Sequence, residues 1–364
     1  MSPPRVHGAW RGAGPKRRTR PSRPLAFLVL LLCTACAQNA ADVGDGVGDG
    51  ERSLFPDLAE FGELPSAPQE SASGEFWDHW GDGHAELSGY RMTIQRYGAA
   101  REAELALIYV TEPHDRRTWI KDDDVAGGDR VEVLKLNSTV QFLTGVYPYS
   151  VMTSVFAPVD RYREEPFAPV RIAHSVQEWC GAYSHFVWPG RDRFRSLRMS
   201  YFAHEGERVS EVDTDRDTLY EDALLVQLRE LDGPFAGGGE WEGLLVPELW
   251  RLRAGHGGTE PVQARIGREQ GVRTAEGREV PVTRFTLTAG EYERVYEVEA
   301  EGARRVLWWS TSTGDEAELV GTARLAYWNL NRPGDEAVRE ELGLSPHGSL
   351  PPGGGEGPAG GCPR

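Results

Sequence analysis

The chain has 364 residues, of which 40 are Lys or Arg and 56 are Asp or Glu, so its net charge at pH 7 is −16. An acidic surface repels the phosphates of nucleic acids and of anionic lipid head groups, which excludes nucleic-acid binding as a function class. The sequence also lacks a G-x-S-x-G elbow, a P-loop, an H-E-x-x-H motif and a dinucleotide fingerprint in a strand–helix context. No cofactor is therefore expected.

The N-terminal segment is predicted to be an export signal. Its first 24 residues contain seven Lys or Arg and no acidic residue, and they lead into an apolar stretch over residues 25–36. Twelve apolar residues are fewer than the roughly 20 that a membrane-spanning helix needs. Removing this segment takes away seven basic residues and no acidic residue, so the net charge of the mature chain is more negative still.

The end of the apolar stretch, CTAC, resembles the lipobox of bacterial lipoproteins. In that family the cysteine thiol is acylated and the cysteine becomes the new N-terminus. For this chain the resemblance implies lipidation of Cys36, and Ala37 after it indicates the outer membrane. Ordinary signal cleavage near ACAQNA, with Cys36 lost or left as a thiol, is the alternative.

Composition divides the remainder of the chain into three parts. Residues 37–74 are rich in Gly, Ala, Ser, Pro and acidic residues, which predicts an acidic flexible linker. The Gly- and Pro-rich composition of residues 345–364 predicts a disordered tail. Between them, residues 75–344 are expected to form a single β-rich globular domain, which could contain two sub-lobes that meet near residues 210–260.

Strand patterns dominate the globular part. Alternating or β-rich runs bounded by Gly, Pro and Asp recur from residue 85 to residue 330, and short turns such as AGGD and EAEG separate them. Helices are predicted over residues 217–233, 55–64 and 245–255, and a short one packs Phe76, Trp77 and Trp80. This pattern indicates a mainly β fold with a few helices (α+β), built on a large curved antiparallel sheet or an open barrel shaped like a clam.

One segment, HSVQEWCGAYSHFVW, places Cys180 between His174 and His185. A strand over residues 171–179 puts His174 about 20 Å from Cys180, which removes it as a partner of the thiol. His185 becomes the candidate base if the chain doubles back over GAYS. The main interpretation is structural burial, because cysteine is commonly a buried residue. A disulfide between Cys180 and Cys362 is a further alternative in an exported chain.

A second segment, FWDHWGDGHAEL, contains His79, Asp82, His84 and Glu86 within eight residues. These are metal-ligating residue types, but their spacing does not match the i, i+4 pair of a helical zinc site. The favoured interpretation is a turn between a short helix and the first strand, and a metal site formed by these four residues is the alternative.

Two stretches, VLKLNSTVQFLTGVYPYSVMTSVF (residues 133–156) and SVQEWCG (residues 175–181), resemble a family of uncharacterised bacterial exported lipoproteins. The resemblance covers most of residues 76–343. Some members carry the label septum formation inhibitor Maf, which implies a cytoplasmic nucleotide pyrophosphatase with a Ser-x-Ser-Pro-Arg-Arg motif. That motif is absent here, so the activity is not carried over. The late strands are also similar to the β-rich, clam-shaped envelope proteins related to lipoprotein carriers, which enclose apolar ligands.

Together these patterns predict a non-catalytic, lipid-anchored protein of the cell envelope, at the outer membrane and facing the periplasm or the cell surface. We expect it to bind an apolar ligand or an envelope partner. One alternative is an envelope hydrolase or thiol enzyme that uses Cys180 and His185. Another is a purely structural interaction module.

Overall fold

The computed structural model describes residues 71–125, 127–161, 167–230, 235, 239–255, 257–275 and 277–346. The α-helices are α1 (Gly74–Trp80), α2 (Leu224–Gln227), α3 (Leu249–Gly255) and α4 (Val338–Glu341). Single 3₁₀ turns are η2 (Gly127–Asp129), η3 (Glu221–Ala223), η4 (Tyr327–Asn329) and η5 (Asp335–Ala337).

Strands form most of the described chain. The first nine are β1 (Ala85–Arg96), β2 (Ala99–Asp115), β3 (Ile120–Lys121), β4 (Arg130–Thr144), β5 (Tyr147–Pro158), β6 (Arg171–Glu178), β7 (Gly181–Pro189), β8 (Arg193–Ser200) and β9 (Arg208–Asp213). The others are β10 (Leu219–Tyr220), β11 (Trp241–Val246), β12 (Val262–Ala275), β13 (Arg278–Ala289), β14 (Tyr292–Glu299), β15 (Val306–Thr311) and β16 (Glu316–Leu325).

All sixteen strands belong to one sheet, whose order is β10-β11-β12-β13-β14-β15-β16-β1-β2-β4-β5-β6-β7-β8-β9, with β3 beside β2. Neighbours are antiparallel except β10 and β11, which are parallel. The sheet is curved and does not close, because β9 and β10 stand at its two ends. The prediction of a mainly β fold built on a large curved antiparallel sheet is confirmed.

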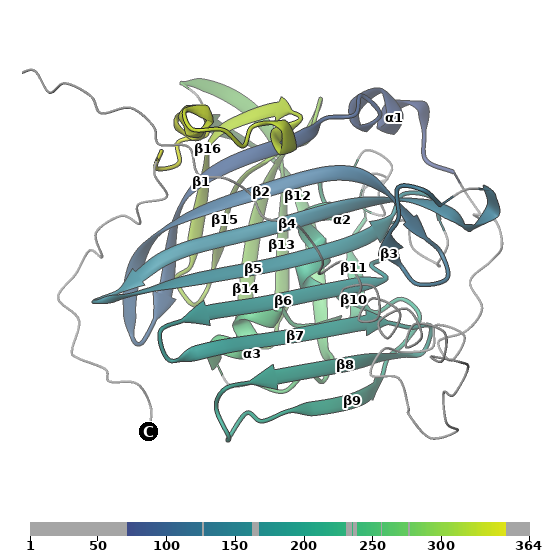
Figure 1. Cartoon of the computed structure of the whole chain (residues 1–364), viewed down its shortest axis with the longest axis vertical. Helices are drawn as coiled ribbons and strands as arrows, with labels where there is room; N and C mark the ends of the chain where they lie inside the picture. The colour runs from purple at the N-terminus through teal and green to yellow at the C-terminus, as the bar shows by residue number, and fades with distance from the viewer. Residues whose placement is uncertain are drawn as a thin grey trace, which may run out of the picture. The chain divides into compact units, whose positions relative to one another are not determined.

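The sheet consists of two meanders that join where β1 pairs with β16. Figure 1 shows the strands from β1 to β9 in front, the later strands behind them, and α2 and α3 between the two sets. The backbone of α2 is held from both sides: Tyr109 Oη on β2 donates to the Leu225 carbonyl at 2.9 Å, and Arg304 Nη2 donates to the Leu228 carbonyl at 3.0 Å. The short helices therefore fill the concave side of the sheet.

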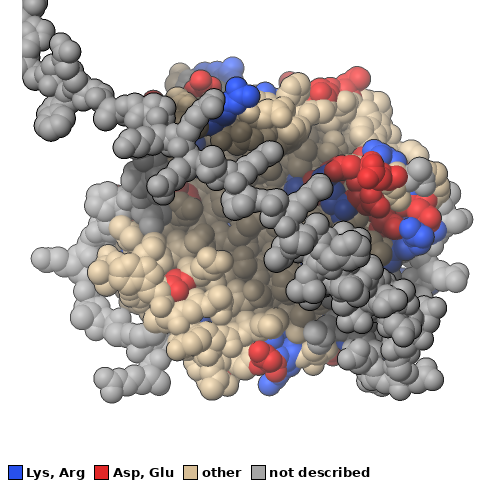
Figure 2. Space-filling model, in the orientation of Figure 1, with Lys and Arg blue, Asp and Glu red and all other residues tan. Residues whose placement is uncertain are grey.

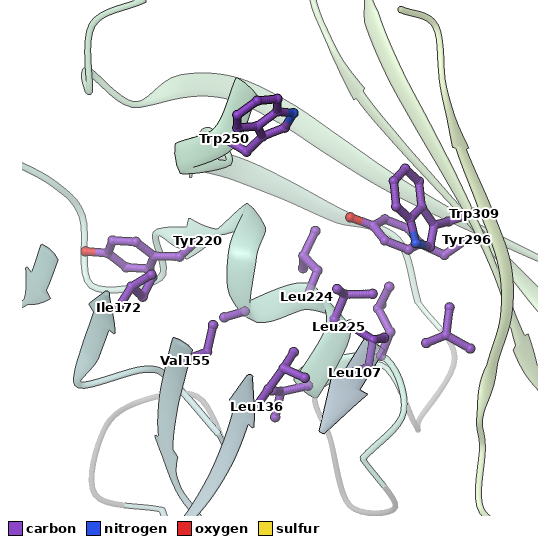
Figure 3. Packing of buried hydrophobic residues seen from close by; sticks show 14 of the residues in the cluster. Leu107, Leu136, Val155, Ile172, Tyr220, Leu224, Leu225, Trp250, Tyr296 and Trp309 are labelled. Carbon is purple, nitrogen blue, oxygen red and sulfur yellow. The ribbon is translucent and has the colours of Figure 1, made fainter. Parts of the chain in front are cut away.

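Alternation along the strands builds the core. In β2, Leu105, Leu107 and Tyr109 are buried while the residues between them are half-buried, since successive side chains in a strand point to opposite faces. Figure 3 shows how Leu224 and Leu225 of α2 lie among such side chains from the sheet. Full burial of one large apolar side chain stabilises a fold by about 1.5–3 kcal/mol, so this interior provides most of the stabilisation.

The helix predicted over residues 217–233 is wrong in its extent. Leu219 and Tyr220 form β10 and pair with Leu245 and Val246, and the α-helix is limited to the four residues of α2. Every residue from 221 to 230 is buried, so this segment lacks the polar face of a surface helix. The predictions of helices at α1 and α3 are confirmed, whereas residues 55–64 lie outside the described residues.

Candidate functional site

Cys180 lies at the turn of a tight hairpin between β6 and β7. Glu178 pairs with Gly181, so Trp179 and Cys180 form the whole loop, and the turn precedes GAYS instead of lying within it. His185 pairs with His174 across the two strands. Five residues of strand separate it from the thiol, about 16 Å. The structure thus does not bring Cys180 and His185 together, and the thiol–imidazole pair of the enzyme alternative is not formed.

The two histidines instead face the concave interior. His174 Nδ1 lies 2.9 Å from Thr153 Oγ1, and His185 Nε2 lies 2.7 Å from Ser196 Oγ. Burial lowers the pKa of His174 to about 3 and that of His185 to about 4, because a buried imidazolium loses its hydration. Both rings are therefore neutral at physiological pH and act as hydrogen-bonding parts of the core.

Aromatic side chains surround the hairpin that carries Cys180. The centroid of the Trp179 ring lies 6.4 Å from that of Tyr147, and burial raises the pKa of Tyr147 to about 12, with smaller contributions from Tyr97 and then from the Cys180 thiol. The Tyr201 ring lies so close to Gly181 that a Cβ there would be 2.5 Å from a ring carbon. We call Tyr97, Val146, Tyr147, Trp179 and Tyr201 the aromatic rim.

The aromatic rim occupies neighbouring strand ends on one margin of the sheet. Val146 lies in the β4–β5 turn, Trp179 in the β6–β7 turn and Tyr201 directly after β8. These three are the most exposed large apolar side chains among the described residues, at 76%, 69% and 69%. Figure 1 shows the turns at the left of the view, and Figure 2 shows that margin as mostly uncharged surface. A cluster of this kind is typical of an interaction site.

Tyr97 has a backbone conformation that few bulky residues adopt, with φ of 55° in the turn between β1 and β2. Its hydroxyl lies 2.7 Å from the hydroxyl of Tyr149. The Arg96 guanidinium lies 4.3 Å from the Tyr97 ring centroid, and Arg96 Nη1 donates to the Ala254 carbonyl of α3 at 3.2 Å. These contacts compensate for the backbone strain and fix this end of the rim to α3.

The concave side of the sheet retains a small chamber of about 40 Å³. Glu248, Arg294 and Asp315 supply its charged groups, and its apolar lining is Met92, Ile94, Leu105, Val140, Val151, Leu225, Trp250 and Trp309. This volume suits a few water molecules and is far below the hundreds of Å³ that enclose a small-molecule ligand. A hollow of about 380 Å³ on the open surface is lined by Gly239, Glu240, Arg268, Glu269 and Gln270, a polar set unsuited to an apolar ligand.

Buried ion pairs surround the chamber. Arg294 Nη1 lies 3.0 Å from Glu248 Oε1 and 3.3 Å from Glu221 Oε1, and Glu221 also accepts from Tyr292 Oη at 2.8 Å. Burial and the neighbouring Glu248 carboxylate raise the pKa of Asp222 well above its ordinary value. This cluster connects β14 with the segment around α2 and α3, and it closes the chamber on its polar side.

Three of the four predicted metal ligands lie near one another, but arginine side chains lie among them. Glu86 Oε1 lies 2.6 Å from Arg229 Nη1, His79 Nε2 lies 3.3 Å from Glu86 Oε2, and Asp82 accepts from Arg324 Nη2 at 2.7 Å. His84 is exposed beside Asp82. The described residues contain no group of three or more His, Cys, Asp or Glu placed to hold a metal ion. The favoured interpretation of this segment as helix, turn and strand agrees with α1 and β1.

Two of the predicted sites, Cys36 and Cys362, lie outside the described residues. Lipidation of Cys36 and a disulfide between Cys180 and Cys362 therefore stay predictions. Within the described ranges, none of the helices has the length and apolar character needed to cross a bilayer.

Comparisons with known proteins add no assignment, since no family model, curated protein or solved structure matches the chain.

Sequence reasoning missed Arg96, Tyr97 and Tyr149 as parts of this margin. The YGAA and YPYS stretches contain the tyrosines, but nothing in either stretch indicates that the first and fifth strands meet beside the Cys180 hairpin. The turn signal at Tyr97-Gly98 was the one local clue, because a positive φ is expected in a two-residue hairpin loop.

Proposed function

We propose that this chain is a non-catalytic protein of the cell envelope, held at a membrane by lipid on Cys36, which acts by binding a partner through the aromatic rim. The observation that carries the proposal is the contrast, within the residues that the structure describes, between the small chamber on the concave side and the exposed aromatic margin. Val146, Trp179 and Tyr201 are exposed together, while the chamber under α3 has only about 40 Å³.

The alternatives receive less support. An apolar ligand of lipid size needs a cavity of several hundred Å³, and the chamber that Leu225 and Trp250 line among the described residues has about 40 Å³. A thiol enzyme needs a base close to Cys180, and the register pairs His185 with His174 instead.

Mass spectrometry of the mature protein tests the anchor. The expected result is an N-terminal peptide that begins at Cys36 with acyl chains attached, and a Cys36→Ala chain that leaves the membrane fraction. An unmodified chain that begins beyond residue 36 contradicts the anchor.

Thiol labelling tests the rim. Val146→Cys and, as the matched control, Val272→Cys are compared in a Cys180→Ser, Cys362→Ser background, because Val272 is 60% exposed and lies on β12. A water-soluble maleimide, added to envelopes that have been opened so that it reaches both membrane faces, should label residue 272 in both these envelopes and the purified protein. It should label residue 146 only after purification. Equal labelling of residue 146 in both preparations contradicts the proposal that the rim is covered in the envelope.

A further inference from the structure

We infer that the partner of the aromatic rim is the lipid–water interface of the membrane that carries the anchor. Val146 and the rings of Trp179 and Tyr201 enter the head-group layer, and the margin of the sheet thereby faces the bilayer. This inference rests on the proposed function, because it names the partner of the same surface.

The arrangement of the rim favours an insertion element. Its most exposed members lie at strand ends that are adjacent in the sheet, since β5 pairs with β6 and β7 pairs with β8. These turns therefore lie on one margin of the sheet, from which they can approach the same head-group layer.

The chemistry of the tips also fits this interface. Trp and Tyr have an apolar body and one polar group, and they concentrate where a bilayer meets water. The turns at Gly145-Val146 and Trp179-Cys180 contain no charged side chain. The Glu178 carboxylate beside them points back to accept a hydrogen bond from the Cys180 backbone N–H at 2.6 Å.

Charge distinguishes this margin from the rest of the chain. The chain has 56 acidic and 40 basic residues, so its net negative charge is repelled by an anionic membrane. The turns at Gly145-Val146 and Trp179-Cys180 are uncharged and meet little electrostatic resistance as they approach a bilayer, whereas the β8–β9 connection that begins at Tyr201 also carries exposed Glu207 and leads to exposed Arg208. The structure therefore points to a zwitterionic lipid surface, bound by apolar and aromatic contacts and not by lysine or arginine.

The aromatic rim is also held in place before it meets a membrane. Arg96 connects Tyr97 to α3. The Tyr201 ring lies against Gly181, and the backbone N–H of Tyr201 donates to the Ala182 carbonyl at 3.2 Å. Preorganised side chains lose less conformational entropy on binding than mobile ones.

The length of chain between the anchor and the described domain bears on how the protein is oriented at the membrane. Thirty-four residues separate Cys36 from Ser71, the first described residue, and a chain of that length spans at most about 110–120 Å. That length sets an upper limit on the distance between the anchor and the described domain, and contacts of the rim select the surface that faces the bilayer.

Tryptophan emission in the presence of brominated lipid tests the inference. The mature, full-length protein is added to phosphatidylcholine vesicles with brominated acyl chains, and the contribution of Trp179 is taken as wild type minus Trp179→Phe. Trp328→Phe gives the matched control, because Trp328 is 47% exposed and lies in η4, beyond β16. The Trp179 contribution should be quenched by brominated lipid and the Trp328 contribution should not. A Trp179 contribution that saturating lipid leaves unquenched overturns the inference.

Two further arms separate this inference from the proposed function. A Cys36→Ser chain lacks the anchor, and the rim alone should still bind vesicles, with at least about tenfold weaker binding when Val146, Trp179 and Tyr201 are replaced by Ser. If the acyl chains are absent from Cys36 but Trp179 is quenched, the anchor fails and the rim inference stands. If Trp179 emission depends on protein concentration without lipid, a second copy covers the rim and the inference is overturned.

Discussion

The guanidinium of Arg96 lies 4.3 Å from the ring centroid of Tyr97, a neighbour whose backbone has a φ of 55°. Strain of this kind costs on the order of 1–3 kcal/mol and persists only where surrounding contacts enforce it. Arg96 provides those contacts by reaching Tyr97, Tyr149 and the Ala254 carbonyl. The positive φ belongs to the two-residue Tyr97-Gly98 turn, and the contacts of Arg96 fix that turn to α3.

Replacing this arginine should destabilise the fold measurably. Arg96→Met removes the cation–π contact and the hydrogen bonds, and we expect the free energy of unfolding to fall by about 2–3 kcal/mol. Arg91→Met on the same strand is the control, because Arg91 is exposed and lies 3.9 Å from Glu318. That change should cost less than about 1 kcal/mol. Equal losses in urea denaturation of the two variants would count against a supporting role for Arg96.

The Gly181→Ala variant should disturb the rim at Tyr201. A Cβ at residue 181 meets the Tyr201 side chain at 2.5 Å, and relieving such overlap costs about 1–3 kcal/mol. Gly271→Ala is the control, since its Cβ meets a Val282 methyl group at an ordinary 3.5 Å. Thermal unfolding should show a lower Tm for the first variant only. A Gly181→Ala protein with an unchanged Tm contradicts the close packing of Tyr201.

The buried pair of Glu86 and Arg229 should be sensitive to loss of one partner. Glu86→Gln leaves a buried guanidinium without its countercharge, and we expect a loss of about 3–5 kcal/mol in the free energy of unfolding. Glu318→Gln, at a surface position, should change it by less than about 1 kcal/mol. A small effect of Glu86→Gln in urea denaturation would mean that water reaches Arg229.

Mild acid should destabilise the protein through its buried histidines. The folded-state pKa values of about 3 for His174 and about 4 for His185 lie below the ordinary value of 6.5, because burial disfavours the charged ring. The unfolded chain then takes up protons below pH 6.5 that the folded chain does not. The free energy of unfolding should fall from pH 6.5 towards pH 4, by about 1.4 kcal/mol per pH unit for each histidine.

His185→Gln tests the pH effect, because glutamine does not titrate and retains a hydrogen-bonding group near Ser196. Denaturant unfolding at pH 7.5 and at pH 5 should show a smaller pH-dependent loss in this variant than in the wild type. The Glu86 pair does not interfere in this window. Although burial opposes it, Arg229 lowers the pKa of Glu86 to about 2, so its contribution is lost only below about pH 4.5. An unchanged pH dependence in His185→Gln contradicts the assignment.

Local pattern predicted much of the sheet and little of the site. Alternation along β2 and the turn residues between strands are properties of single segments, so the sequence indicates them directly. The helix predicted over residues 217–233 was too long because the apolar spacing of this segment suits a helix, whereas Leu219 and Tyr220 at its start pair with β11. Burial on all sides is set by the fold and not by local propensity.

The contacts of the rim depend on strand order. Tyr97 and Tyr149 are far apart in sequence and meet only because β1, β2, β4 and β5 are consecutive in the sheet. The position of Cys180 at the hairpin turn could have been predicted from the Trp-Cys-Gly sequence as a turn signal. Its separation from His185 follows from a register that the sequence alone does not specify.

Photo-crosslinking in the intact envelope shows whether the aromatic rim contacts membrane lipid. A photoreactive amino acid is placed at residue 179 and, as a control, at residue 328, and the products are identified by mass spectrometry. We expect adducts of membrane lipid at residue 179 and none at residue 328. Residue 179 that reacts only with water, or with the same products as residue 328, would contradict the claim that the aromatic rim is the surface by which this protein meets its membrane.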